Sequence, residues 1–277
     1  ASLVFSHETL NGLVKKYAPL IPESVRNKFV NWHNRKLAAS FDTVIATTDF
    51  AAAEFVRIKT TNLRKVALGV DLVSFRPENR DHKLRKELLR DADYLLVHCG
   101  RMSPEKEPAR SVQAVSELVK AGINVRLIIV GGGPLWHKIR KQSLGLPIEM
   151  LGYVASRGKV ASYLAAADIA IAPGPLETFC LSALESLASG TPVVASKSSA
   201  VGEILNINSM KPAGAVASDN GAEFAIAIRQ LLNKGRLRKV AREQAEKFSW
   251  ANTVDAMLDV HGAKQPMVTT KRRLKVA

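Results

Sequence analysis

The sequence is poor in the residues and segments that mark several common classes of protein. It has only two cysteines, Cys99 and Cys180, and no second Cys or His lies near either of them at the spacing of a metal site. No apolar run approaches the ~20 residues that a membrane-spanning helix needs, and the first residues lack the pattern of a signal peptide. We therefore expect reduced thiols, no bound metal, and a cytoplasmic protein that is soluble or peripheral.

Aromatic residues are also few, at 6% of the chain, and they do not alternate with the basic residues. Lys and Arg number 40 against 25 Asp and Glu, so the formal net charge is +15. Such a charge attracts polyanions: nucleic acid, anionic lipid headgroups or substrates that carry a diphosphate. Because the basic clusters lack the interleaved aromatic side chains that stack on bases, we expect no nucleic-acid partner.

Short apolar runs alternate with amphipathic stretches of helical period along the whole chain, which is typical of βα units and parallel sheets. The pattern predicts an α/β fold. In the first part we expect strands at residues 3–5, 43–46 and 66–68, and helices at 23–40 and 50–58. In the second part we expect about six strands, including 94–98, 126–130, 148–151, 169–172 and 192–195, and helices at 104–121, 135–141, 159–165, 181–189, 222–233 and 236–247.

The two parts are separated by a segment that runs from Gly69 to Pro77 and is followed by a charged run at residues 78–86, as interdomain linkers often are. The lobe boundary is therefore predicted near Arg76, with a first lobe at residues 1–76 and a second at 77–247. The first residue is Ala1 rather than Met, and a strand begins at once. We therefore expect the first lobe to be incomplete.

Ligands of open parallel sheets bind beyond the carboxyl ends of the strands, so the loops at those ends are the places to search. In the loop from Gly100 to Lys106, Ser103 suits a helix N-cap and Pro104 the first helical position. Arg101 lies in the same loop, and two cations beside a helix N-terminus form an anion site. The alternative is that these cations are merely solvated in a surface turn.

A second loop, Gly131 to Pro134, is rich in glycine and could let the backbone approach a ligand closely. No Gly-Lys-Ser/Thr follows it, so it is not a phosphate-binding Walker loop. The spacing also fails the Gly-x-Gly-x-x-Gly pattern, because Trp136 stands where the third glycine would be. Kinase and dehydrogenase functions lose support.

The third loop lies between the strand at 169–172 and the helix at 181–189, and it carries Glu177 just before that helix, with Glu185 inside it. At helical rise, eight residues separate the two carboxylates by about 12 Å, so they could bind opposite ends of a nucleotide sugar. The free backbone N–H groups at the helix start could hold sugar hydroxyls or a phosphate; they belong to Thr178, Phe179, Cys180 and Leu181. A glutamate near a helix N-terminus is favourable without any such function.

Three segments together carry a resemblance to a known family: Arg101 with Lys106 after Gly100, the glycine-rich turn after Val130, and Glu177-x7-Glu185 followed by Gly-Thr-Pro. With these, the chain resembles the large family of retaining glycosyltransferases that have two Rossmann-like lobes (GT-B fold) and use nucleotide sugars. Narrower matches around residues 5–8, 41–44, 68–72 and 96–101 are similar to actinobacterial phosphatidylinositol-mannoside mannosyltransferases. The segment 248–250 matches the start of a helix that crosses back to the first lobe, so residues 248–277 are expected to form a crossover helix and a basic tail.

The resemblance implies roles for single residues. It places Arg101 and Lys106 on the donor diphosphate, Glu177 at the donor sugar, Glu185 on the ribose, and His7, at the end of the first strand, beside the reacting centre. Among the further donor-site residues that we expect are Gly100, Gly131 and Val154, together with the four residues that start the helix at 181–189. A departure from the family pattern is Cys180, which stands where glycine is usual.

The resemblance further implies a hexosyltransferase that needs no metal or other cofactor and transfers mannose from GDP-mannose, with retention, to a lipid or glycan acceptor at the anionic inner face of the plasma membrane. Two alternatives stay open. One is a UDP- or ADP-sugar transferase that makes a soluble glycan, and the other is a non-catalytic module that binds nucleotide sugar or, through its basic surface, nucleic acid. With its first lobe incomplete, the chain alone could be inactive.

Overall fold

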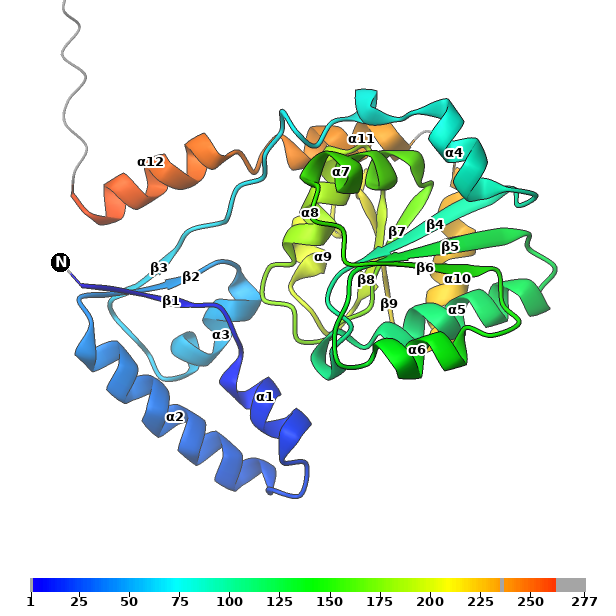
Figure 1. Ribbon diagram of the computed structural model, residues 1–277. Helices are drawn as coiled ribbons and strands as arrows, with labels where there is room; N and C mark the ends of the chain where they lie inside the picture. Colours follow the sequence, from blue (N-terminus) through cyan, green and yellow to red (C-terminus); the bar gives the residue numbers. More distant parts are fainter. Residues whose placement is uncertain (1, 235–236, 263–277) are drawn as a thin grey trace, which may run out of the picture.

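The computed structural model describes residues 2–234 and 237–262. These residues form two α/β lobes, each built on a parallel β-sheet (Figure 1). The α/β class predicted from the alternating pattern is confirmed.

The first lobe has a sheet of three parallel strands in the order β1-β2-β3. The strands are β1 (Leu3–Ser6), β2 (Thr43–Ala46) and β3 (Leu63–Lys65), and the helices are α1 (Leu10–Tyr17), α2 (Glu23–Ser40) and α3 (Asp49–Arg57). The prediction of a strand at 66–68 was wrong, because the chain pairs with β2 three residues earlier, with Leu63 opposite Val44. Val66 is the next residue after that strand, and its N–H still donates to the carbonyl of Ala46 at 2.9 Å.

The second lobe has a six-stranded parallel sheet in the order β6-β5-β4-β7-β8-β9. Its strands are β4 (Tyr94–Cys99), β5 (Val125–Val130), β6 (Ile148–Gly152), β7 (Ile169–Ala172), β8 (Val193–Ser196) and β9 (Gly214–Ala217). Strand order reverses between β4 and β7, and such a switch point opens a crevice at the carboxyl ends of the two strands.

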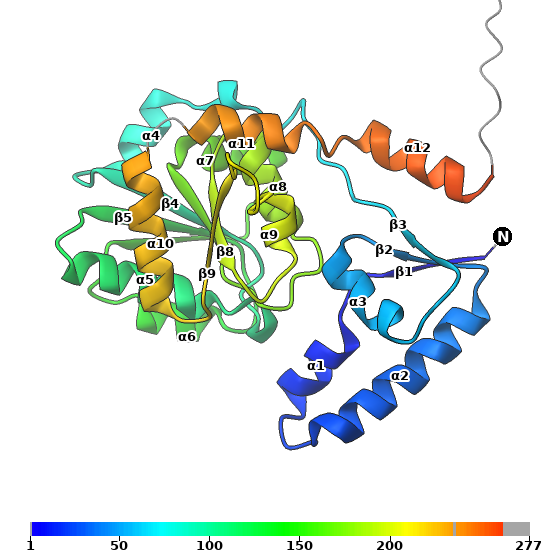
Figure 2. The same ribbon diagram turned by 180° about the vertical axis from the view of Figure 1, so that it is seen from behind.

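Helices cover both faces of this sheet. One face is packed by α5 (Pro108–Lys120), α6 (Trp136–Gln142) and α10 (Gly221–Lys234), as the reverse view shows (Figure 2). The other face is packed by α7 (Arg157–Ala166), α8 (Leu181–Ala188) and α11 (Leu237–Ala245). Both layers are dominated by fully buried aliphatic side chains, so the sheet is a rigid platform for the loops at its edge.

Several elements differ from the prediction. The helix expected at 104–121 is split into a 3₁₀ turn, η2 (Pro104–Lys106), and α5, because Glu107 adopts a left-handed conformation with φ 46° between them. Ser103 therefore does not cap α5; its hydroxyl donates to Glu105 instead, at 2.5 Å. The charged run at 78–86, expected as a linker, forms η1 (Pro77–Asn79) and most of α4 (His82–Leu89). Three further elements, α1, α9 (Val201–Ile204) and β9, were not expected.

Within the part of the chain that the structure describes, the chain crosses between the lobes twice, and the two crossings lie side by side. Residues 66–76 lead from β3 into the second lobe, and α12 (Trp250–Val260) lies beside the start of this segment (Figure 1). The N–H of Val70 donates to the carbonyl of Phe248 at 2.9 Å, and Val70 forms a parallel bridge with Ser249. A Cβ on Gly69 would stand 2.4 Å from the nitrogen of Trp250, so only glycine allows this approach. The segment 248–277, predicted as a crossover helix and basic tail, contains α12, and its residues 263–277 lie outside the described residues.

Candidate active site

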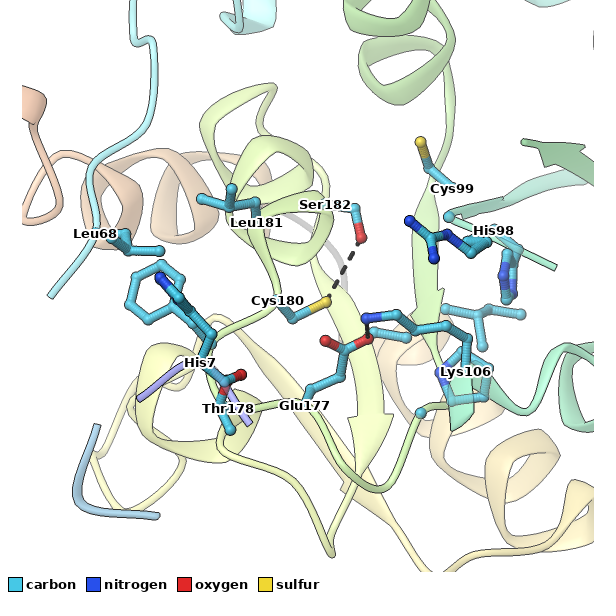
Figure 3. Close-up of a pocket in the computed structure, with 17 residues that line it drawn as sticks. His7, Leu68, His98, Cys99, Lys106, Glu177, Thr178, Cys180, Leu181 and Ser182 are labelled. Atoms are coloured by element: carbon cyan, nitrogen blue, oxygen red, sulfur yellow. Dashed lines mark hydrogen bonds and ion pairs between the residues drawn. The ribbon is translucent and has the colours of Figure 1, made fainter. Parts of the chain in front are cut away.

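A cavity of about 330 Å³ lies at the carboxyl ends of β4 and β7, where the first lobe meets the second (Figure 3). It is lined by residues of the first lobe and of the loops that follow both strands: His7, Leu68, His98, Cys99, Gly100, Arg101, Lys106, Ile171, Ala172, Pro173, Gly174, Glu177, Thr178, Phe179, Cys180, Leu181 and Ser182. Most of the site residues predicted from the sequence are in this set. Those that are absent from it are Gly131, Val154 and Glu185.

Lys106 and Glu177 form an ion pair in this cavity, with Nζ 2.7 Å from Oε1 (Figure 3). The Glu177 side chain is 12% exposed and that of Lys106 is 36% exposed. Burial by itself lowers the pKa of the Lys106 ammonium, but the Glu177 carboxylate outweighs this and the pKa is raised overall. The cation therefore stays charged at neutral pH, available to any anion that displaces or joins the carboxylate.

The loop that carries Glu177 is fixed to the first lobe through Thr178. The Thr178 carbonyl accepts hydrogen bonds from the hydroxyls of Thr47, at 3.1 Å, and Thr48, at 2.8 Å. The Thr178 hydroxyl in turn donates to the carbonyl of His7 at 2.5 Å. Glu203 adds a second connection, since its carboxylate accepts from two backbone N–H groups at the start of α3 at 2.8 Å each. The position of the Glu177 loop therefore depends on the first lobe.

The start of α8 presents backbone donors to the same cavity. No hydrogen bond within residues 2–234 and 237–262 uses the N–H groups of Thr178, Phe179, Cys180 or Leu181. Cys180 precedes the helix in a left-handed conformation, with φ 71° and ψ 78°, which turns the chain from the loop into α8. Glycine adopts this conformation without strain. The preference for glycine at this position in the family that the sequence resembles therefore has a backbone cause.

The glycine-rich turn after β5 does not line the cavity; it packs against the loop at Gly100 to Met102. The nearest atom to a Cβ on Gly131 would be the carbonyl oxygen of Gly100 at 1.9 Å, and a Cβ on Gly133 would be 2.6 Å from the carbonyl oxygen of Met102. Any side chain there would push away the loop that carries Arg101. Val154, expected in the donor site, packs partly buried against the hydrophobic core of the second lobe.

Glu185 lies in α8 as predicted, outside the lining of the cavity, and its carboxylate is 3.6 Å from the guanidinium of Arg157. Burial raises the pKa of Glu185, an effect that Arg157 partly offsets. The 12 Å separation expected between Glu177 and Glu185 assumed a continuous helix, and that assumption was wrong, because helical geometry begins only at Leu181. Arg101 lines the cavity, is exposed, and makes no ion pair within the described ranges.

His7 lies at the end of β1, exposed to the cavity, with its ring stacked on Phe5 at 5.4 Å between centroids. Next to it is Glu8, which the sequence did not single out. Burial raises the pKa of Glu8, while Lys106 lowers it and Glu177 raises it, so these groups share one electrostatic environment. The sequence analysis also missed the pocket-lining His98, whose only signal was a polar residue inside an apolar strand.

Within the described part of the chain, no group of three or more His, Cys, Asp or Glu residues could hold a metal ion. No helix among the same residues is long and apolar enough to cross a membrane. The two cysteines are free thiols that line the cavity, and burial raises the pKa of each to about 12. Neither thiol is therefore ionised at neutral pH.

Comparison with known proteins agrees with the geometry. Residues 79–248 match the family model of glycosyl transferases group 1. A GDP-mannose-dependent alpha-(1-6)-phosphatidylinositol dimannoside mannosyltransferase from Mycobacterium tuberculosis is 42% identical over 264 residues, which are 95% of this chain and 68% of that protein. A D-inositol 3-phosphate glycosyltransferase from Saccharomonospora viridis is 31% identical, with 82% of this chain and 56% of that protein covered.

Solved structures show the same fold. Sucrose-phosphate synthase from Thermosynechococcus elongatus superposes with a TM-score of 0.76 at 22% identity, covering 94% of this chain and 67% of that one. HepE from Anabaena, solved with UDP-glucose, gives a TM-score of 0.76 at 19% identity and covers 95% of this chain and 72% of that one. With its two Rossmann-like lobes and the family match across its second lobe, the chain belongs to the group 1 glycosyl transferases of the GT-B fold.

Proposed function

We propose that the protein transfers a mannosyl group from GDP-mannose, with retention of anomeric configuration, to a phosphatidylinositol mannoside or a similar glycolipid. The observation that carries this proposal is the Lys106–Glu177 pair, which faces free backbone N–H groups at the switch point of the second lobe. The relative from Mycobacterium tuberculosis, at 42% identity, supports the choice of GDP-mannose and of a mannosylated lipid.

In this proposal the donor occupies the cavity with its diphosphate on the cationic side. Arg101, exposed and without an ion pair in the described residues, and Lys106 hold the phosphates together with the N–H groups at the start of α8. Glu177 accepts hydrogen bonds from sugar hydroxyls. Glu185, which pairs with Arg157 outside the cavity lining, holds the ribose.

The transfer needs no covalent intermediate on a carboxylate. The bond between the anomeric carbon and the phosphate oxygen breaks, and the acceptor hydroxyl attacks from the same face of the sugar. The departing diphosphate takes the proton of that hydroxyl while Arg101 and Lys106 stabilise its negative charge, which is the larger part of the catalysis. His7 lies at the cavity mouth on the first lobe, beside the reacting centre and the acceptor.

An apolar surface on the first lobe suits a lipid acceptor at a membrane. A groove of about 580 Å³ between α1 and α2 is lined almost entirely by apolar side chains, among them Leu13, Val14 and Phe29. Leu20, in the turn between these helices, is 95% exposed, and Trp32 on α2 is 54% exposed. The exposed cations on α2 (Lys28, Arg35 and Lys36) would attract anionic headgroups, as the net charge of +15 would.

The test is transfer of radiolabelled mannose from GDP-mannose into organic-extractable product, with phosphatidylinositol dimannoside in anionic vesicles, and UDP-glucose and ADP-glucose as competing donors. We expect lipid-linked label from GDP-mannose, sensitive to α-mannosidase, and its loss in Lys106→Met. Lys16→Met is the matched control, because Lys16 pairs with Glu107 outside the cavity lining. Transfer only from a uridine or adenosine donor, or full activity in Lys106→Met, would contradict the proposal.

A further inference from the structure

His98 is a buried imidazole at the floor of the cavity that the roles above leave unused. It lies near the end of β4, is 2% exposed, and lines the cavity together with Cys99 and Lys106 (Figure 3). The residues before it on β4, Leu95 to Val97, are aliphatic and buried. Burying a polar imidazole ring costs free energy unless its nitrogens form hydrogen bonds, so the partner of each nitrogen must be identified.

One nitrogen has a partner inside the protein. Nδ1 is 2.8 Å from the hydroxyl oxygen of Ser111, a fully buried residue in the first turn of α5. The other nitrogen, Nε2, takes part in no hydrogen bond among the residues that the structure describes. The Cβ position of Gly100 is 3.8 Å from Nε2, so this nitrogen lies directly beneath the loop that leads to Arg101.

The imidazole ring of His98 is uncharged at neutral pH. Burial, and next the positive charge of Lys106, lower the pKa of His98 to about 4. A neutral imidazole has one N–H and one lone pair, and the partner of one nitrogen fixes the state of the other. If the Ser111 hydroxyl donates to Nδ1, the proton of the ring is on Nε2 and faces the cavity.

We propose that His98 is a donor-binding residue whose Nε2–H donates a hydrogen bond to the terminal phosphate of a nucleoside diphosphate, with Ser111 holding the ring in that tautomer. The inference rests on the proposed function, because it assumes that the cavity takes a sugar nucleotide. A phosphate oxygen only accepts hydrogen bonds, and the tautomer with a bare Nε2 would direct a lone pair at it. His98 thus adds a donor beside Lys106 without adding a charge that would retain the product diphosphate.

The variants are chosen by the position of their amide groups. His98→Gln places an N–H close to where Nε2 is, whereas His98→Asn places it near Nδ1, and His98→Leu removes both donors. Ser111→Ala keeps the imidazole ring but removes the hydrogen bond that fixes which ring nitrogen carries the proton. Dissociation constants of GDP and GMP are measured by calorimetry for each, because only GDP has the terminal phosphate.

A hydrogen bond to a charged group corresponds to roughly ten- to a hundredfold in affinity. We expect His98→Asn and His98→Leu to bind GDP weaker by about that factor while GMP binding is unchanged, and His98→Gln to stay within about threefold of wild type. Ser111→Ala should lose less affinity for GDP than His98→Leu does. Two-bond ¹⁵N–¹H spectra of the wild type should show the proton on Nε2, a readout that does not depend on any variant folding.

A wild-type ratio of GDP to GMP affinity in His98→Asn and His98→Leu would overturn the inference and leave the proposed function standing. A proton on Nδ1 in both the free and the GDP-bound protein would overturn it as well. If the wild type binds no diphosphate among GDP, UDP and ADP, the proposed function fails and the inference fails with it. Melting temperatures without ligand separate a folding defect from a binding defect.

Discussion

Replacing Glu177 with Gln should tighten the binding of GDP while it weakens the turnover of GDP-mannose. In the unliganded protein the Glu177 carboxylate is 2.7 Å from Lys106, so an incoming diphosphate competes with it for the same cation. Gln keeps the shape of the side chain and removes its charge. GDP lacks the mannosyl group that Glu177 would bind, so with Gln it gains access to the Lys106 cation and loses no contact, whereas GDP-mannose loses the carboxylate that would hold its mannose hydroxyls.

The magnitude follows from the geometry of two anions on one ammonium. A phosphate and a carboxylate that both contact Lys106 are about 6 Å apart, and their repulsion is about 0.7 kcal/mol in water and about 3 kcal/mol at an effective dielectric constant of 20. Because the Lys106 side chain is 36% exposed, a value near the lower limit applies. Relief of about 1 kcal/mol corresponds to roughly fivefold tighter GDP binding.

Calorimetric titration with GDP and single-turnover transfer from GDP-mannose measure the two effects separately. Glu185→Gln is the matched control, since the same chemical change is made on a carboxylate that pairs with Arg157 outside the cavity lining. If Glu185 holds the ribose, its variant binds GDP about tenfold weaker. Weaker GDP binding in Glu177→Gln, or equal changes in both variants, would refute the competition between the carboxylate and the diphosphate.

Three further outcomes are expected. Thr47→Val should lower the free energy of unfolding, measured in urea, by about 1 kcal/mol. Thr48→Val should lower it by about twice as much, because it also removes the N-cap of α3. Equal losses in the two variants would contradict the assigned hydrogen bonds. Burial lowers the pKa of His98 from 6.5 to about 4, so the unfolded state binds a proton at His98 before the folded state does as the pH falls. The free energy of unfolding of the wild type should therefore fall by about 3 kcal/mol between pH 6.5 and 4 relative to that of His98→Gln. Parallel curves of unfolding free energy against pH for the two proteins would exclude this. Cys180→Gly should be more stable than Cys180→Ala by about 1 kcal/mol in thermal melts, since only Gly relieves the positive φ; identical melting temperatures would show that no strain is stored there.

Some elements could be predicted from the sequence to the residue. The strands at Thr43–Ala46 and Ile169–Ala172 and the helix at Glu23–Ser40 have the predicted bounds. The strand β9 (Gly214–Ala217) was missed because its residues are small, and small side chains give little of the apolar signal that marks a strand. The helix α4 was missed because charged residues dominate its sequence and resemble a linker.

The same division holds for the candidate site. Lys106 and Glu177 could be identified because each follows a recognisable strand in the loop beyond its carboxyl end, and parallel strands bring such loops together. Their ion pair could not be predicted, because it depends on the left-handed backbone of Glu107 and on the arrangement of two loops that are 71 residues apart. His98 and Glu8 were missed for a similar reason: burial and electrostatic proximity are properties of the assembled lobes.

The crossing at Gly69 and Trp250 has a mechanical consequence. Among the described residues, both covalent connections between the lobes pass through this one place, where a glycine permits backbone contact and Val70 pairs with Ser249. A small rotation there changes few atoms locally, yet it displaces the opposite side of the interface, where Thr178 meets His7, through a much longer arc. The paired connections are thus placed to act as a pivot, and the lobes could separate about it only if the hydrogen bonds of Thr178 to the first lobe broke.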